Sequence, residues 1–279
     1  MTTTVATNRA EIRPAAMSEQ RAVLLTRLGI VASVLLVWEA LARSGLLYRD
    51  VVPSLVRILR EFVPPFVERS FSANLGERSF YANLGVTIGE VTVAIAIGGV
   101  AGIAVGIVLG RSRFLQRAYE PLLHYLGPTP KIIFFPIMIM WFGVGPGSKI
   151  AMGALSSFFP VAISVAAAMR EIDAVLIRVG LSFRLNNAQM VRMIYLPAMR
   201  APVINGIRIG LGVAIIGTLL AETKLANQGL GYAVIQTYAT FNMPRMYALL
   251  LVVFLLAVGV NTVLGRYTQL RAARRPSEG

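Results

Sequence analysis

The sequence predicts an all-α, polytopic membrane protein with about six transmembrane helices. Of its 279 residues, 56% are hydrophobic and only 14% are charged, whereas about a quarter of a soluble domain is charged. The mean hydropathy is +0.68. Apolar runs of about twenty residues, the length needed to cross the hydrocarbon core of a bilayer, recur along the chain and alternate with Arg-rich segments.

The composition also limits the kinds of functional site that the chain can form. The chain has no Cys and one His, His124, which leaves no basis for a disulfide framework, a thiolate metal site or a His cluster. A net charge of +14 would suggest a nucleic-acid partner for a soluble protein. In a membrane protein, Arg residues instead set the topology and contact lipid headgroups. We therefore expect no nucleic-acid partner, no metal and no cofactor in this chain.

The N-terminal part predicts a tail, a span and a polar outer segment. Residues 1–22 lack apolar periodicity and predict a disordered cytoplasmic tail, and residues 22–41 predict the first span. Pro53 opens a run that predicts a short amphipathic interfacial helix. The nine-residue stretches 68–76 (ERSFSANLG) and 77–85 (ERSFYANLG) differ at one position. We interpret them as a tandem duplication, because lengthening a surface segment costs little; its role is left open.

The second span is expected over residues 84–109. Four glycines recur in it at every fourth position, which predicts a face for close contact with another helix: Gly98, Gly102, Gly106 and Gly110. The arginines that follow directly, Arg111, Arg113 and Arg117, predict that this end of the span is cytoplasmic.

The third span is expected over residues 121–142 and contains Pro130 and Pro136. Prolines break the backbone ladder, and the freed carbonyls need partners in protein or water. A helix of this kind is seldom surrounded by lipid on all sides, so we expect one face of it to line a protein interior or a water-filled space. The residues expected on that face are Pro136, Met138, Met140, Trp141 and Phe142. Ordinary packing is the alternative for the methionines.

Three further spans are expected over residues 149–169, 203–221 and 246–265. The fifth span is rich in glycine, with Gly206 and Gly210 among them, and ends at Glu222. A short interfacial or re-entrant helix is expected in the outer segment 223–245. The membrane domain then covers residues 23–266, with a cytoplasmic tail at 267–279 and both termini on the cytoplasmic side.

The polar segment between the fourth and fifth spans is the most informative stretch. It is Arg-rich, which predicts a cytoplasmic location, and a loop of this length is usually functional. Residues 173–179 predict a helix that ends at Gly180, and residues 187–196 predict a second helix that is interrupted by Pro197. Two short helices at the inner face of the membrane predict a docking surface.

This segment resembles the EAA loop of binding-protein-dependent ABC transporter permeases, most closely those of the nitrate/sulfonate/taurine branch. The matching residues are Gly180, the Leu196-Pro197 pair, the run GIRIGLG that begins at Gly206, and Ala221-Glu222. The chain departs from the family pattern at two places. Ala174, Val175 and Leu176 stand where the family has Glu-Ala-Ala, and the next proline, Pro202, lies one residue later than in the family.

Two other stretches are similar to the same family. One is Pro130-Lys131 with Pro136 and the run Trp141-Phe142-Gly143-Val144-Gly145, and the other is Gly229-Leu230-Gly231-Tyr232. The resemblance implies a fold like that of a type I ABC importer permease, with six spans and both termini inside.

The resemblance further implies that the loop is a coupling helix seated in an ATPase subunit. The implied coupling residues are Asp173, Ala174, Leu176, Arg178, Gly180, Leu181, Arg184, Leu196 and Pro197. The implied path adds Gly206, Gly210 and Glu222 to the five residues of the third span. Whether the missing Glu at Ala174 weakens docking is left open.

The implied partners are two copies of an ABC ATPase, a soluble solute-binding protein and a second permease copy in the bacterial inner membrane. A homodimer is expected, with a heterodimer as the alternative. The chain itself is not expected to be an enzyme: it contains no GxxxxGK[ST] phosphate-binding stretch, so ATP would be used by the partner subunit. The implied solute is a nitrate-, sulfonate- or taurine-like anion, and a vitamin precursor is the alternative.

Two other function classes were weighed against this one. An ion-coupled secondary transporter often has repeated halves around charges at the middle of the membrane, and an intramembrane enzyme needs a metal site or a nucleophile with its base; neither pattern is seen. Glu39, Glu90 and Lys131 fall near predicted span ends, where their charged groups are expected to reach the interface. Glu222 is in register with the closing Glu of the family.

Overall fold

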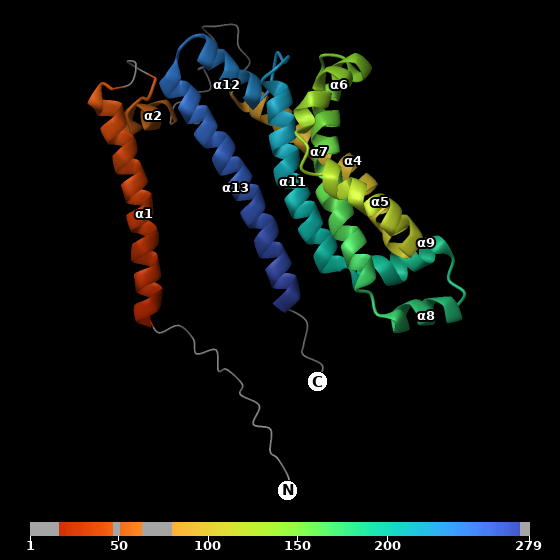
Figure 1. Cartoon of the computed structure of the whole chain (residues 1–279). Coiled ribbons are helices and arrows are strands. Elements are labelled where there is room, and N and C mark those ends of the chain that lie inside the picture. Colours follow the sequence, from red (N-terminus) through yellow and green to blue (C-terminus); the bar gives the residue numbers. More distant parts are fainter. Residues whose placement is uncertain (1–16, 47–50, 63–79, 274–279) are drawn as a thin grey trace. The chain divides into compact units, whose positions relative to one another are not determined.

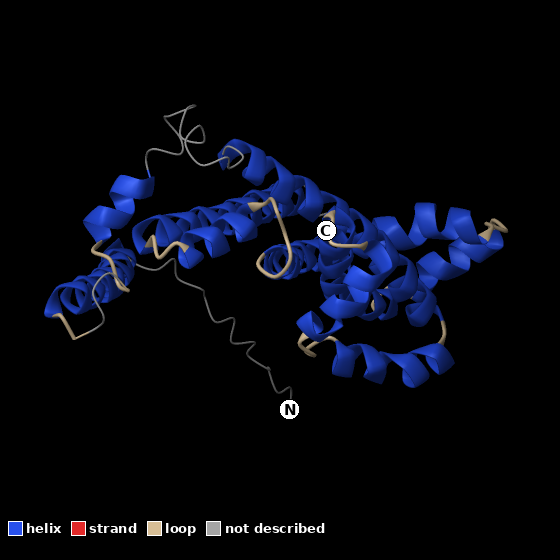
Figure 2. Ribbon diagram, turned by 90° about the horizontal axis from the view of Figure 1, so that it is seen from above, coloured by secondary structure: helices blue, strands red, loops and turns tan. Residues whose placement is uncertain are grey.

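The computed structural model describes residues 17–46, 51–62 and 80–273. In these residues every regular element is a helix, joined by loops (Figures 1 and 2). Five helices are long and apolar enough to cross a membrane, and a bent pair makes a sixth span if it is counted as one. The elements are α1 (Met17–Ser44), α2 (Leu55–Phe62), α4 (Phe80–Arg111), α5 (Arg113–Leu126), the 3₁₀ turn η1 (Lys131–Phe134), α6 (Phe135–Phe142), α7 (Pro146–Arg170), α8 (Ala174–Ser182), α9 (Asn187–Gln189), the π-helical segment η2 (Met190–Tyr195), α10 (Leu196–Ala198), α11 (Arg200–Glu222), α12 (Leu230–Ala239) and α13 (Met243–Ala273).

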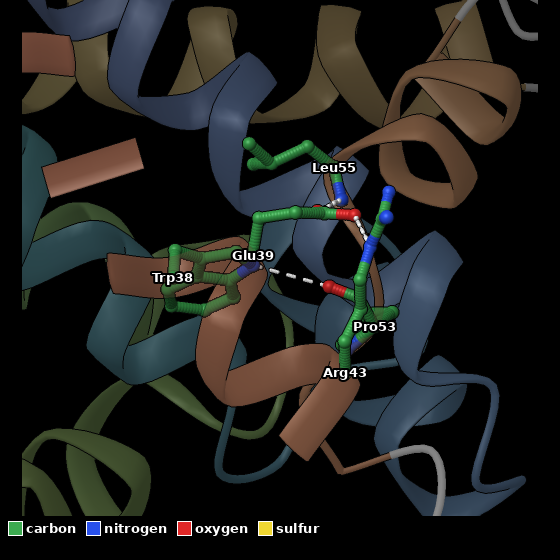
Figure 3. Close-up of polar contacts among 5 residues, drawn as sticks. All are labelled: Trp38, Glu39, Arg43, Pro53 and Leu55. Carbon is green, nitrogen blue, oxygen red and sulfur yellow. Dashed lines mark hydrogen bonds and ion pairs between the residues drawn. The ribbon is translucent and has the colours of Figure 1, made fainter. Parts of the chain in front are cut away.

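The described residues up to Arg60 form a unit of their own, in which α1 is joined to the predicted interfacial helix α2. The carboxylate of Glu39 accepts a hydrogen bond from the backbone N–H of Leu55 at 2.9 Å (Figure 3). It also forms an ion pair with Arg43 at 2.7 Å. The indole N–H of Trp38 donates to the Pro53 carbonyl at 3.1 Å. Glu39 thus stabilises the first turn of α2, where an anion is favoured by the helix dipole.

The ends of the chain differ in part from the sequence prediction. α1 begins at Met17, so residues 17–22, expected in a disordered tail, are helical. α13 continues to Ala273, so residues 267–273 are helical as well. The rest of both tails and most of the duplicated stretch lie outside the described residues.

In the second unit, which begins at Glu61, α7 packs between α4 and α11. The predicted glycine face of α4 is confirmed, because it lies directly on α7. A Cβ at Gly102 would be 2.9 Å from Cβ of Val161, and one at Gly106 would be 2.6 Å from Cβ of Val165. Only glycine allows backbones to approach this closely.

α11 also packs against α7 through glycines that allow the two backbones to approach closely. A Cβ at Gly206 would lie 2.8 Å from Cβ of Ser164, and one at Gly210 would lie 2.8 Å from Cγ2 of Val161. Val161 therefore contacts both neighbouring helices and is completely buried. α4, α7 and α11 form the rigid centre of this unit.

The third span, expected over residues 121–142, starts earlier than predicted and is divided into two helices. Its first part, α5, begins at Arg113, and the chain then bends by 93° before η1 and α6. The bend falls between Gly127, which is still in the helical conformation, and Pro130, which is extended. Pro136 lies in the first turn of α6, where its missing N–H costs nothing.

The two helices of the polar loop also differ from the prediction. α8 does not end at Gly180 but runs on to Ser182. The residue after its C-cap, Arg184, has a left-handed φ of 52°. Arg184 N donates to the Leu181 carbonyl and Leu185 N donates to the Gly180 carbonyl. This is a Schellman ending. Pro197 does not interrupt the second helix, because it falls in the first turn of α10, directly after the π-helical segment η2.

Candidate functional site

Residues 171–200 contain the predicted coupling residues, are here called the coupling segment for that reason, and fold into capped short helices. The Asp173 carboxylate caps α8 by accepting from Val175 N at 2.8 Å. Asn186 and Gln189 form a reciprocal capping box at the start of α9, with both hydrogen bonds at 2.8 Å. These caps satisfy backbone donors that have no partner inside a helix. In Figure 1, α8 and α9 lie at the end of α7 and α11 opposite to α6 and α12.

The coupling segment is joined to the helix bundle by a hydrophobic core. Met190, Tyr195 and Met199 are buried together with Val165 and Met169 of α7, Ile107 of α4 and Val203 of α11. Met199 is only 1% exposed. Because close-packed interiors deform little, the coupling segment and the adjoining ends of α4, α7 and α11 should move as one body.

One polar contact adds to this attachment, and an ion pair next to the segment joins α7 to α5. The guanidinium of Arg111, the last residue of α4, donates to Oδ1 of Asn187 at 2.9 Å and lies 5.9 Å from the ring centroid of Tyr195. Arg170, the last residue of α7, pairs with Glu120 of α5 at 2.9 Å. The sequence analysis treated Arg111 only as a topology determinant. The contact between Arg111 and Asn187 could not be predicted from the sequence, because the two residues are 76 positions apart.

The opposite side of the coupling segment is an exposed apolar surface. The exposed fraction is 52% for Val175, 62% for Leu181 and 77% for Phe183. Of the predicted coupling residues, six are exposed along α8 and its ends: Asp173, Ala174, Leu176, Arg178, Leu181 and Arg184. Gly180 is buried, and Leu196 and Pro197 are half-buried in α10. Exposed apolar side chains grouped in this way are available for contact with a partner.

The predicted path residues lie on two elements, α6 and α11. On α6, Pro136, Met140, Trp141 and Phe142 are exposed, and Met140 is the most exposed of them at 83%. Met138 is half-buried and packs against the cluster that contains Phe135, Met152 and Ala221. On α11, Gly206 and Gly210 lie in the contact with α7 described above.

Glu222 lies in a buried polar cluster far from the coupling segment, at the α12 end of the bundle. It is completely buried and accepts from the Thr87 hydroxyl at 2.7 Å and from Gly231 N at 2.6 Å. The Thr87 hydroxyl in turn accepts from Leu230 N at 2.8 Å. A Cβ at Gly229, where φ is +106°, would overlap the Glu222 carboxylate. Glu222 thus caps the first turn of α12 and joins α11, α4 and α12.

Two further ionisable groups are buried, and the sequence analysis predicted the burial of neither. Glu90 is only 4% exposed, so the prediction that it reaches the interface is wrong. Lys149 is 1% exposed, and its ammonium donates to the carbonyls of Val144 at 2.7 Å and Gly145 at 2.9 Å. Neither position was recognisable from sequence, because each lies near the end of a span and is buried only by neighbouring helices.

Comparison with known protein families identifies the family of this chain. Residues 98–274, more than half of the chain, match the family described as the binding-protein-dependent transport system inner membrane component. The chain belongs to this family. The matched region includes the coupling segment, α11 and Glu222, so the resemblance that was predicted from the Gly180-to-Glu222 pattern is confirmed.

Within this family the permease chain is similar to proteins of the predicted branch. It is 33% identical over 172 residues to the taurine transport system permease protein TauC of Escherichia coli, covering 60% of this chain and 62% of that protein. It is 28% identical over 217 residues to the putative aliphatic sulfonates transport permease protein SsuC of Bacillus subtilis, covering 78% and 75%. The match therefore spans less than two thirds of the length of TauC.

A solved structure shows the same fold. A chain of the MetNI methionine ABC transporter, in an inward-facing conformation, superposes with a TM-score of 0.59 at 23% identity, covering 68% of this chain and 94% of that chain. The predicted likeness to an ABC importer permease fold is thus confirmed at the level of the fold.

Proposed function

We propose that this chain is the membrane-spanning permease subunit of an ATP-driven importer and forms the translocation path for a small solute. The observation that carries the proposal is the coupling segment. It is rigidly joined to three helix ends through its buried core and presents an exposed apolar surface on its other side. The coupling segment and both termini then face the cytoplasm of a bacterial cell, with the spans in the inner membrane.

The driving reaction takes place in a partner. Two copies of an ABC ATPase bind and hydrolyse ATP, and the exposed surface around Leu181 and Phe183 docks on them. When the ATPase subunits approach each other, the coupling segment moves with them. Because it shares a core with α4, α7 and α11, its movement shifts these helices between two arrangements, as expected of a two-state element biased from a distant site.

The path itself forms between two permease copies. The exposed side chains of α6, with Met140, Trp141 and Phe142, and of α11, with Ile209 and Ile216, are the surfaces available for the path and for the second copy. In this arrangement Gly206 and Gly210 keep α11 close to α7, and Glu222 fixes the α12 end of the wall. We propose a homodimer; a sister permease in place of the second copy is the alternative.

The proposed solute is a small anion of the sulfonate, taurine or nitrate type, delivered by a soluble binding protein. The support is the similarity to permeases whose names refer to taurine and aliphatic sulfonates. A vitamin precursor is the alternative solute. A thermal-shift screen of the binding protein encoded next to this permease, with these anions and with heterocyclic vitamins, separates the two.

The test is ATP-dependent uptake in proteoliposomes that contain the permease, the ATPase and the binding protein. Deletion of residues 174–184 should abolish ATP-dependent uptake and loosen binding of the ATPase, because it removes α8 and its exposed surface. The permease should still insert, since the deleted residues lie outside the spans. Uptake that persists in the deletion variant, or that an ion gradient drives without ATP, would refute the proposal.

A further inference from the structure

Glu90 is a buried acid that the proposed transport function does not use. It projects from α4 and is 4% exposed. Within the described residues, no hydrogen-bond donor reaches either of its carboxyl oxygens. Its electrostatic neighbours are Glu222 of α11 and Lys149 of α7. An ionised carboxylate without donors is costly to bury, and a second carboxylate next to it raises the cost further.

Glu222 is in the opposite situation, because both of its oxygens receive donors. Gly231 N–H can only donate, and it points to Oε2. The Thr87 hydroxyl accepts from Leu230 N–H and donates to Oε1 of Glu222. Glu222 thus accepts at both oxygens, as an ionised carboxylate does.

The charges around the pair do not balance if both acids are ionised. Lys149 supplies one positive charge against two negative ones. Lys131 does not help, because its ammonium donates to the carbonyls of Gly127 and Thr129 and lies over the Phe159 ring. α12 contributes no acid or base apart from the phenols of Tyr232 and Tyr238. One additional positive charge, held at Glu90, makes the cluster neutral.

We propose that Glu90 is a proton-binding site. Glu90 takes up one proton on a carboxyl oxygen and donates it in a hydrogen bond to the carboxylate of Glu222, so the two acids together carry a single negative charge next to Lys149. The proton comes from the solvent, and no other bond changes. A metal cation suits the site less well, because the Lys149 ammonium already interacts with both acids and would repel it.

The proton serves to hold the α12 end of the bundle together. With it, α4 and α11 attract each other under the turn of residues 229–231 that Glu222 caps. Without it, two like charges face each other in a buried site. Because the folded protein then holds a proton that the unfolded chain has lost at neutral pH, stability must fall as the pH rises. Neither consequence depends on transport.

The first experiment is infrared spectroscopy of the permease in lipid at neutral pH. The wild type should show the carbonyl stretch of a protonated carboxylic acid, and Glu90→Gln should lose it. Glu120→Gln is the matched control, because Glu120 pairs with Arg170 and is partly open to solvent; it should keep the band. Absence of the band in the wild type, or its persistence in Glu90→Gln, would overturn the proposal.

The second experiment is thermal unfolding of the same proteins as a function of pH. The wild-type midpoint should fall by several degrees between neutral and alkaline pH. The midpoint of Glu90→Gln should not fall over this pH range. The amide of the glutamine donates the same hydrogen bond and has no proton to lose. If sodium instead raises the wild-type midpoint and leaves Glu90→Gln unchanged, the site binds a metal cation and the proton assignment is wrong.

Discussion

At the scale of single residues, the helix α8 ends at a position where its residue types do not predict an end. Gly180, a residue type that often ends helices, lies inside α8, and the left-handed position after the helix is occupied by Arg184. Gly180 lies in the middle of α8, where a Cβ would be 2.5 Å from Sδ of Met190 and 3.3 Å from Cγ1 of Ile194. Arg184 adopts the left-handed conformation that ends the helix, which costs a non-glycine residue about 1–2 kcal/mol. The glycine is needed for close packing, and the turn is enforced by its hydrogen bonds.

We therefore expect Gly180→Val to destabilise the permease by about 1–3 kcal/mol, the usual cost of overpacking, because Met190 is itself buried. It should also reduce ATP-dependent uptake. Arg184→Gly is the matched control and should leave the unfolding midpoint unchanged or raise it, since glycine adopts a left-handed φ without strain. Thermal unfolding of the isolated permease measures both variants. Equal destabilisation by the two substitutions would contradict the packing role of Gly180.

At the scale of the elements, the coupling segment is continuous in sequence with α7 and α11 but reaches α4 only through tertiary contacts. The buried cluster around Ile107 and Tyr195 provides the apolar part of this link. Arg111 provides the polar part, through Asn187 and the face of Tyr195. An exposed cation–π contact contributes about 0.5–1 kcal/mol, so Arg111 should affect the transmission of movement more than stability.

Arg111→Ala should lower ATP-driven uptake severalfold while the associated ATPase continues to hydrolyse ATP, because α4 no longer follows the coupling segment through this contact. Arg111→Lys should recover little, since an ammonium cannot stack as a planar guanidinium does. Arg117→Ala removes a charge from the same end of the bundle and serves as the control. The ratio of solute transported to ATP hydrolysed is the measurement; an unchanged ratio in Arg111→Ala would remove Arg111 from coupling.

At the scale of the whole molecule, the proposed orientation places the coupling segment inside the cell and the segment after α11 outside. The natural absence of Cys makes this directly measurable, because single-cysteine variants need no further background changes. Phe183 is 77% exposed in the coupling segment, and Leu225 is 52% exposed beyond α11. These two positions flank α11, a helix long enough to cross the membrane.

Phe183→Cys should react with a membrane-impermeant thiol reagent only from the cytoplasmic side, and Leu225→Cys only from the outside. The unmodified protein, which lacks thiols, is the control for non-specific labelling in intact cells and inverted vesicles. Reaction of Phe183→Cys from outside would place the coupling segment where no ATPase could bind it, and the proposed function would fail with it.

The sequence by itself determined the fold class, the position of most spans and the family. These follow from local features: the length of the apolar runs, the four-residue glycine spacing on α4, and the Gly180-to-Glu222 pattern. It also located the short helices α2 and α12. Each of these properties is set by neighbouring residues or by a regular period, so it can be recognised without knowing what the segment contacts.

Only the tertiary structure decided the bend between α5 and α6, the contact of Arg111 with the coupling segment, and the burial of Glu90, Lys149 and Glu222. These properties depend on residues far apart in the chain: Glu222 is buried because Thr87 and Gly231 close over it. A hydropathy profile shows that a charged residue lies near the end of a span. It does not show whether a neighbouring helix buries that residue. The physical reason is that burial is a property of the packed bundle and not of the segment.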